Sequence, residues 1–552
     1  MNSSPTKNLF FQPKVWLIAI IALSALLLFF RPGARSLWEP DEGRFAEITR
    51  EMVESGDWLT PRNNYIKHFD KPPVLFWLIG SSFLLFGQNE AAAHLPLSIL
   101  SLLGVLATFS LGTELFNRRT GFIAALILAT SAGYGALSRL LSTDIVLTVL
   151  CILSYLCFVR KKYFWLYLTL GIAFMTKGPI IFVLSLIPMI IFLIYTKDWA
   201  RLKQMRLGWG LLFTLAIALP WFIYQVSRNE RLFYDWTVQQ TYNRIARPMR
   251  SPIYFFIPVL CGLFFPHIFF LIPAFKKYFS LKRVGLAKEQ AATLLVLIWF
   301  FLPFVFFSFA VKKLVTYMLP LLPALSLFLA RLWDEALEDQ KITATKIFSW
   351  AHLLFIVILG LLAIAPLGFL ASGQAVKLGV SAGQANMVAM SAIFTLGLIG
   401  GIRLFRRNNI PALFMLIIGV ATLFLLNSID VLPRIEDATG RSMKTLALTI
   451  KQDLKPEDKV VTYRCFLSSL PFYLQRRVIV VERQRNIAYE ETEHWRDYLL
   501  KDKAALYQLL SSPGIKVYCI TYTWEYDQIA QEYPQPLERL GQAGKYVLFR
   551  NK

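Results

Sequence analysis

Long apolar stretches fill the first 429 residues, and they constrain the fold more than any other feature of the sequence. A helix that crosses a bilayer needs about 20 consecutive, mostly apolar residues. We count thirteen candidate segments, some of them short, at residues 15–30, 93–115, 120–141, 145–159, 163–176, 179–195, 207–226, 253–274, 291–309, 318–332, 347–369, 386–403 and 411–427. Only 17% of the 552 residues are charged, against about a quarter in soluble proteins. The sequence therefore predicts a polytopic α-helical membrane protein and excludes a soluble globular enzyme, a disordered chain and a collagen.

Positive charges predict how the spans are oriented. The chain has a formal net charge of +23, and most of the excess lies before residue 430. Loops rich in Lys and Arg stay in the cytoplasm, and the basic loops obey this rule only if Pro72–Gly87 is not a span. We expect that segment to lie along the outer interface or to re-enter the membrane. With an uncleaved first span at Val15–Phe30 and the N-terminus inside, the C-terminal residues fall outside. Because the basic residues are spread between apolar spans, we expect no nucleic-acid partner.

Residues 430–552 have the composition of a soluble domain. Short β-rich runs alternate there with helical patterns, which favours a small α/β domain. The β-rich runs are Lys459–Arg464, Val478–Val481, Lys516–Tyr522 and Lys545–Phe549, and the helical patterns are Ser442–Leu454 and Trp495–Leu510. We therefore divide the chain into a membrane domain, 1–429, with an outer loop at 31–92, and an outer α/β domain, 430–552. Cys465 and Cys519 lie in this outer domain, either paired or as free thiols.

Acidic residues, which are costly inside a bilayer, gather in the loop after the first span. Eight of them lie between residues 31 and 71. Pro40 suits the first turn of a helix, so Asp41 and Glu42 are expected at its positive end, either as functional carboxylates or only as capping groups. The apolar face of this helix, which we expect on the membrane surface, consists of Phe45, Ile48 and Met52. The acids expected on its solvated face are Glu47, Glu51 and Glu54.

More candidates lie near the predicted outer ends of the spans. His68, Asp70 and Lys71 precede the pair Pro72-Pro73, either as a site or as a surface ion pair. Asp144 is the only acid between Glu114 and Asp198. Outer loops also carry cations against the orientation rule, namely Arg228, Arg231, Arg244, Arg247, Arg250, Lys312 and Lys313, the last close to Tyr317. These cations either form an outward-facing anion site, since guanidinium and ammonium groups bind phosphate, or belong to long loops that escape the rule.

The absence of other motifs narrows the chemistry. The sequence has no glycine-rich nucleotide motif, no H-E-x-x-H and no Cys/His cluster, so a divalent ion would be held mainly by carboxylates. Outward-facing carboxylates, cations and an apolar body together favour one reaction. A carboxylate takes a proton from an acceptor hydroxyl, cations stabilise a departing phosphate, and the apolar body holds the lipid that carries this phosphate.

Three segments, Trp38–Ile48, His68–Pro73 and Lys313–Pro320, resemble motifs of the GT-C membrane glycosyltransferases. The sequence is most similar to the branch of the lipid A aminoarabinose transferases, and the protein mannosyltransferases are a related branch. This resemblance implies about thirteen transmembrane helices followed by an outer soluble domain. It also implies that Asp41 is the catalytic carboxylate and that Asp144 is the acid of the second outer loop, which we expect to be catalytic as well.

The resemblance assigns further roles. The residues expected around the carrier phosphate are Arg44, Lys71 and Tyr317, with Arg247 of the basic loop as another candidate. From the residue pattern, and not from the resemblance, we expect Glu42, His68 and Lys313 as supporting residues. Asp70 takes the place of a Glu that is often found in the family, and it is the one candidate metal ligand. Whether a divalent ion binds there stays open, because loop 227–252 has no His that could join Asp70 as a ligand.

The prediction is thus an inner-membrane glycosyltransferase that acts on the periplasmic side. Its first expected reaction moves 4-amino-4-deoxy-L-arabinose from undecaprenyl phosphate to lipid A. The alternative moves mannose or another hexose to protein or to a different envelope glycolipid. The expected partners are the undecaprenyl-phosphate sugar, the acceptor and membrane lipids. A secondary transporter is the interpretation from another class, but no internal repeat is visible and the acids lie in a loop.

Overall fold

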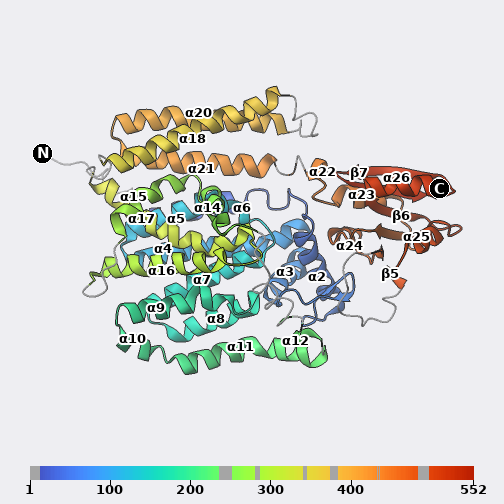
Figure 1. Ribbon diagram of the computed structural model, residues 1–552, viewed down its shortest axis with the longest axis horizontal. Helices are drawn as coiled ribbons and strands as arrows, with labels where there is room; N and C mark the ends of the chain where they lie inside the picture. The colour runs from blue at the N-terminus through green and yellow to red at the C-terminus, as the bar shows by residue number, and fades with distance from the viewer. Residues whose placement is uncertain are drawn as a thin grey trace. The chain divides into compact units, whose positions relative to one another are not determined.

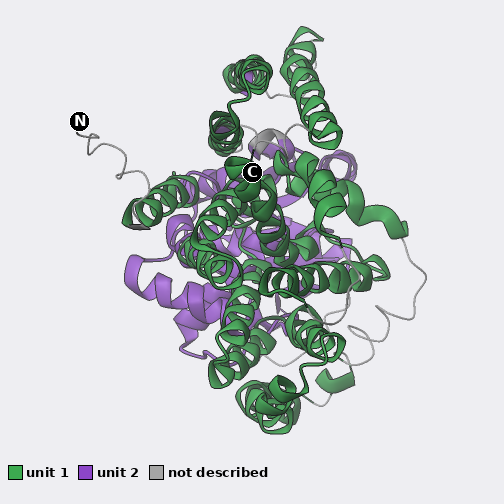
Figure 2. Ribbon diagram, turned by 90° about the vertical axis from the view of Figure 1, so that its left-hand side faces the viewer, with its two compact units in different colours: residues 1–31, 97–372, 385–429 green, residues 32–96, 373–384, 430–552 purple. Residues whose placement is uncertain are grey.

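The computed structural model describes residues 13–229, 231–234, 236, 251–279, 286–339, 345–372, 383–431, 433, 436–482 and 497–552. Its contacts divide the chain into two compact units, coloured separately in Figure 2. Unit 1 comprises residues 1–31, 97–372 and 385–429, and unit 2 comprises 32–96, 373–384 and 430–552. The sequence placed residues 31–92 with the membrane domain, whereas the contacts group 32–96 with the C-terminal segment.

Unit 1 is helical (Figure 1). Its first half contains α1 (Pro13–Phe29), α4 (Glu90–Leu115, which begins in unit 2), α5 (Arg118–Thr130), α6 (Ala132–Leu137), α7 (Thr143–Val159), α8 (Tyr163–Lys177), η2 (Phe182–Leu186), α9 (Ile187–Tyr195), α10 (Trp199–Gln204), α11 (Leu207–Arg228) and α12 (Leu232–Tyr234). Its second half contains η4 (Ile253–Phe255), α14 (Phe256–Leu263), η5 (His267–Phe270), α15 (Leu271–Tyr278), α16 (Lys288–Ser308), η6 (Val315–Leu321), α17 (Leu322–Glu338), α18 (Lys346–Ala371), α20 (Gln384–Arg406) and α21 (Ile410–Val431).

All thirteen predicted spans coincide with helical segments, but fewer have the length of a span. Among the described residues, seven helices are long and apolar enough to cross a membrane, or eight if the pair Ile253–Leu263 and His267–Tyr278, bent by 111°, is one span. The predicted span at 120–141 is divided between α5 and α6, and α7 and α8 have 17 and 15 residues. The polytopic fold is therefore confirmed, while the number thirteen stays a prediction.

The C-terminal part of unit 2 is the predicted α/β domain, but the helical pattern predicted for Trp495–Leu510 was wrong in its first part, where Leu499–Leu500 form a strand and the helix begins at Lys503. One sheet has the strand order β5-β4-β3-β6-β8-β7. The first four strands in this order, β5, β4, β3 and β6, run parallel to one another. Strand β8 is antiparallel to both of its neighbours, β6 and β7. Its strands are β3 (Lys459–Tyr463), β4 (Ile479–Val481), β5 (Leu499–Leu500), β6 (Val517–Tyr522), β7 (Leu537–Ala543) and β8 (Tyr546–Asn551). Its helices are α22 (Glu436–Thr439), α23 (Lys444–Asp453), α24 (Ser469–Leu474), α25 (Lys503–Leu510) and α26 (Thr523–Glu532).

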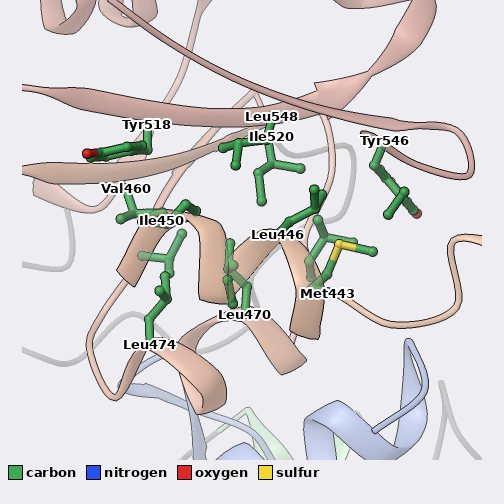
Figure 3. Packing of buried hydrophobic residues seen from close by; sticks show 14 of the residues in the cluster. Met443, Leu446, Ile450, Val460, Leu470, Leu474, Tyr518, Ile520, Tyr546 and Leu548 are labelled. Carbon is green, nitrogen blue, oxygen red and sulfur yellow. The ribbon is translucent and has the colours of Figure 1, made fainter. Parts of the chain in front are cut away.

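Strand alternation separates the two cysteines of this domain. Tyr518 and Ile520 of β6 pack into the cluster with α23 and α24, shown in Figure 3, and Cys465 belongs to the same cluster. Cys519 points to the other face of the sheet, into a cluster with α25 and α26. Successive side chains of a strand face opposite sides, so both cysteines stay free thiols and the disulfide does not form.

The rest of unit 2 is the loop after the first predicted span. It contains α2 (Asp41–Ser55), the short strands β1 (Arg62–Asn63) and β2 (Ile66–Lys67), and α3 (Val74–Phe86). Helix α2 packs on both α3 and α24, and a Cβ on Gly43 would lie 2.6 Å from the backbone nitrogen of Ser469. Only glycine permits this close approach of two backbones. With 13 residues, α3 is shorter than a span.

Candidate active site

Four predicted site residues form one charged network in unit 2. The carboxylate of Asp41 accepts a hydrogen bond from Arg44 at 2.6 Å. The guanidinium of Arg44 lies 3.6 Å from the carboxylate of Asp70, and Lys71 Nζ lies 3.2 Å from the same carboxylate. The structure therefore brings Asp41, Arg44, Asp70 and Lys71 together, although 19 residues lie between the two motifs in the sequence.

The local backbone explains where Asp41 lies. Pro40 occupies the position before α2, as its fixed φ favours, and the carbonyl of Trp38 accepts the N–H groups of Glu42 and Gly43. Asp41 is the first residue of the helix, where the dipole favours a negative charge. Its side chain is 66% exposed. The predicted helix start is confirmed, and the carboxylate is accessible to a substrate.

The cations leave binding capacity for an anion. Arg44 Nε is buried and has no hydrogen-bond partner among the described residues. Burial alone would raise the pKa of Asp70, but Lys71, Arg44 and His68 hold it well below its usual range. Asp70 is therefore ionised and positions the two cations. An unpaired guanidinium N–H beside an ammonium group is suited to a phosphate oxygen.

Glu42 supports the loop instead of contributing a free carboxylate. It accepts hydrogen bonds from Arg35 at 2.5 Å and from the backbone N–H of Trp38 at 3.0 Å, and it lies 3.4 Å from His94. Burial disfavours its charged form, but Arg35 and His94 lower the pKa of Glu42 to about 2. These contacts fasten the segment before α2 to the start of α4.

The prediction that three acids of α2 lie on a solvated face was wrong for two of them, Glu47 and Glu51. Glu47 is fully buried and is bound by Arg50 through two hydrogen bonds of 2.7 and 2.8 Å. Glu51 is also buried, and one of its oxygens accepts the backbone N–H of Tyr65 at 2.8 Å. Burial and the neighbouring Glu47 raise the pKa of Glu51 well above its usual value. Helix α2 is enclosed by protein because both α3 and α24 pack on it.

A second group of site residues lies in unit 1. Asp144 is in the first turn of α7, where the hydroxyl of Ser142 accepts its backbone N–H at 3.0 Å. Lys177 Nζ at the end of α8 lies 2.5 Å from the carboxylate of Asp144 and 4.9 Å from the centre of the Tyr317 ring. The structure therefore joins Asp144 and Tyr317 through a lysine that the sequence analysis missed. Lys177 is the only charged residue between 163 and 196, and a lone charge in an apolar stretch was the available signal.

The other candidates have separate places. Lys313 is buried and donates to the backbone carbonyls of Ser251 and Pro252 at 2.9 and 3.2 Å, so it anchors that segment. His68 contributes, after Lys71 and Arg44, to the low pKa of Asp70. Arg247 lies outside the described residues. Among the described residues no three His, Cys, Asp or Glu side chains gather as metal ligands. Asp70 faces two cations here, and the divalent ion stays an expectation from the sequence that no step below uses.

Comparison with known proteins places the chain. Residues 70–224 match the family described as dolichyl-phosphate-mannose-protein mannosyltransferase. The undecaprenyl phosphate-alpha-4-amino-4-deoxy-L-arabinose arabinosyl transferase of Yersinia enterocolitica is 30% identical over 428 residues, which are 73% of this chain and 75% of that protein. The chain belongs to this arabinosyl transferase family. A member from Proteus mirabilis is 30% identical over 359 residues, 62% of this chain and 63% of that protein.

Solved structures agree with the arabinosyl transferase fold. The crystal structure of ArnT from Cupriavidus metallidurans bound to undecaprenyl phosphate matches with a TM-score of 0.81 over 98% of both chains, at 22% identity. Its apo state matches with a TM-score of 0.78. The resemblance to the GT-C glycosyltransferases and the fold class are thereby confirmed. The chain is a glycosyltransferase, and the transporter interpretation has no support among these relatives.

Proposed function

We propose that this glycosyltransferase moves 4-amino-4-deoxy-L-arabinose from undecaprenyl phosphate to lipid A, at the periplasmic face of a bacterial inner membrane. One observation carries the proposal. An exposed carboxylate at a helix start, Asp41, is connected through Arg44 and Asp70 to Lys71, so an acid and two cations converge on one place. Transfer from the donor named for the family needs these same groups. A carboxylate is needed to deprotonate the acceptor, and cations are needed to stabilise the phosphate that leaves.

The proposed reaction is a displacement at the anomeric carbon of the sugar. An acceptor oxygen forms a bond to this carbon while the bond to the phosphate oxygen breaks, and the electron pair goes to undecaprenyl phosphate. Asp41 takes the proton of the acceptor oxygen. General-base assistance of this kind contributes about 10²- to 10⁴-fold to the rate.

Arg44 and Lys71 are assigned to the departing phosphate. Negative charge grows on this group as the bond breaks, and preorganised cations stabilise it more strongly in the transition state than in the ground state. Asp70 holds both cations in position. For Asp144 and Tyr317 we keep the roles that the resemblance implies, as the acid of the second outer loop and as a residue around the carrier phosphate. Both lie close to the ammonium group of Lys177, which supports a role for this group in binding or transferring charged substrates.

The alternative function is transfer of mannose or another hexose to protein or to a different glycolipid. It is favoured by the mannosyltransferase match over residues 70–224. The arabinosyl transferase match extends over 73% of the chain and favours aminoarabinose. The two functions differ in the donor sugar that is consumed.

Replacing Arg44 or Lys71 by alanine should weaken inhibition by undecaprenyl phosphate by about 10- to 100-fold, because a hydrogen bond to a charged group is worth about 1.5–3 kcal/mol. The measurement is the inhibition constant of undecaprenyl phosphate in a transfer assay with purified enzyme. Arg62→Ala is the matched control, since Arg62 pairs with Asp57 at 2.9 Å in the same unit and surface pairs contribute little. Wild-type inhibition in both variants would remove the phosphate assignment.

A further inference from the structure

Three aromatic rings form a stack in the C-terminal part of unit 2. The rings of Trp524 and Tyr522 are parallel within 6°, with centroids 4.5 Å apart. On the other side, the ring of Tyr522 stacks on Tyr546, with centroids 5.2 Å apart. Trp524 is 51% exposed, whereas Tyr546 is buried. The stack is thus covered at its inner end and accessible at Trp524.

The sheet makes this stack rigid. Tyr522 ends β6 and Tyr546 begins β8, and the two residues are partners in the antiparallel ladder. The backbone N–H of Thr523, which begins α26, donates to the carbonyl of Lys545 at 2.9 Å. Tyr546 lies at the margin of the hydrophobic cluster shown in Figure 3. A preorganised surface of this kind binds with a small loss of conformational entropy.

A cation accompanies the rings. Lys545 Nζ lies 5.1 Å from the centre of the Tyr522 ring and 5.3 Å from that of Tyr546. Lys545 is exposed, and it forms no ion pair with the residues that the structure describes. We define Trp524, Tyr522, Tyr546 and Lys545 as the aromatic platform. It offers a flat face with negative quadrupole potential and, beside it, a positive charge.

The platform is connected to the loop that carries Asp41 by a short path within unit 2. The turn before Lys545 packs on Gly440, since a Cβ on Gly544 would lie 2.6 Å from the backbone nitrogen of Gly440. The next residue, Arg441, accepts the backbone N–H of Glu39 at 2.7 Å through its carbonyl. Glu39 in turn accepts the N–H groups of Ser468 and Ser469. The platform and the start of α2 therefore share one rigid support.

We infer that the aromatic platform binds the phosphorylated sugar headgroup of the acceptor glycolipid. The C–H face of a sugar ring carries partial positive charge and stacks on the outer face of Trp524, while a phosphate on that sugar pairs with Lys545. This inference rests on the proposed function, because it takes lipid A as the acceptor. It names a site for the acceptor that is separate from the residues assigned to the donor phosphate.

Steady-state kinetics with lipid A in detergent micelles test the inference. Trp524→Ala and Lys545→Ala should each raise the KM for lipid A by about 5- to 10-fold, whereas kcat and the KM for the donor change by less than about twofold. Trp524→Phe, which keeps a ring, should restore most of the affinity. Matched controls are Leu448→Ala, an exposed apolar residue of α23, and Lys516→Ala, an exposed lysine directly before β6. A KM for lipid A that is unchanged, or raised equally by the controls, would overturn the inference.

Direct binding separates this inference from the proposed function. Lipid A binding to the enzyme without donor should weaken in Trp524→Ala, and removal of the lipid A phosphates should abolish the effect of Lys545→Ala. If the wild-type enzyme transfers no sugar but binding depends on Trp524, the proposed function fails and the platform stands. If transfer proceeds and binding ignores Trp524, the platform fails and the function stands. Trp524-dependent binding of phospholipid vesicles lacking lipid A would identify a membrane anchor and overturn the inference.

Discussion

Asp41→Asn should lower the turnover of sugar transfer by about 10²- to 10⁴-fold, the contribution of a general base. Asparagine has nearly the same shape and still accepts a hydrogen bond from Arg44, but it cannot take a proton. The side chain of Asp41 is 66% exposed and contributes to no buried core, so the variant should fold normally. The measurement is kcat with saturating donor and acceptor, together with the midpoint of thermal unfolding.

The matched control for this prediction is Asp57→Asn in the same outer loop. Asp57 accepts the backbone N–H groups of Leu59 and Thr60 at 3.1 and 3.0 Å, and an asparagine oxygen preserves these contacts. Its turnover should stay within about twofold of wild type, as is usual for a substitution away from the chemistry. Near-normal turnover in Asp41→Asn would mean that another group accepts the proton.

Arg50→Ala should lower the free energy of unfolding of unit 2 by about 3–5 kcal/mol, because removing one partner of a buried ion pair leaves an uncompensated charge. Arg50 is 1% exposed and binds both carboxylate oxygens of Glu47, a fully buried residue of the same helix. The measurement is the unfolding midpoint of the purified protein in detergent. It is followed by near-ultraviolet circular dichroism and by the protease resistance of unit 2.

Glu54→Gln is the matched control, since Glu54 also binds Arg50, at 2.5 Å, but its side chain is 50% exposed. Surface ion pairs are worth about 0–1 kcal/mol, so this variant should be nearly as stable as wild type. Equal loss of stability in the two variants would contradict the view that Glu47 and Arg50 form the buried centre of this region. Wild-type stability in Arg50→Ala would contradict it as well.

Local patterns predicted the elements of this fold well. The apolar runs became helices, and the four β-rich runs became β3, β4, β6 and β8, because hydrophobic periodicity decides secondary structure locally. Pro40 and Asp41 marked a helix start for a reason that needs no tertiary contact. The network of Asp41, Arg44, Asp70 and Lys71 was anticipated from motifs that contain all four residues.

Tertiary contacts were not predictable in the same way. Glu47 and Glu51 lie on a helix face that is polar by pattern, yet α24 comes from more than 400 residues away and covers α2. Lys177 pairs with Asp144 across two helices, and sequence spacing gives no indication of that contact. Cys465 and Cys519 belong to two clusters on opposite faces of one sheet, and different helices cover those two faces. Each of these features depends on which distant segment covers a given face.

The most direct test of the account is mass spectrometry of lipid A after incubation with the purified enzyme and two competing donors, undecaprenyl phosphate-linked 4-amino-4-deoxy-L-arabinose and undecaprenyl phosphate-linked mannose. We expect lipid A to gain aminoarabinose, free undecaprenyl phosphate to appear in equal amount, and Asp41→Asn to suppress both. Transfer of mannose instead, or no transfer from either donor by a folded enzyme, would contradict it.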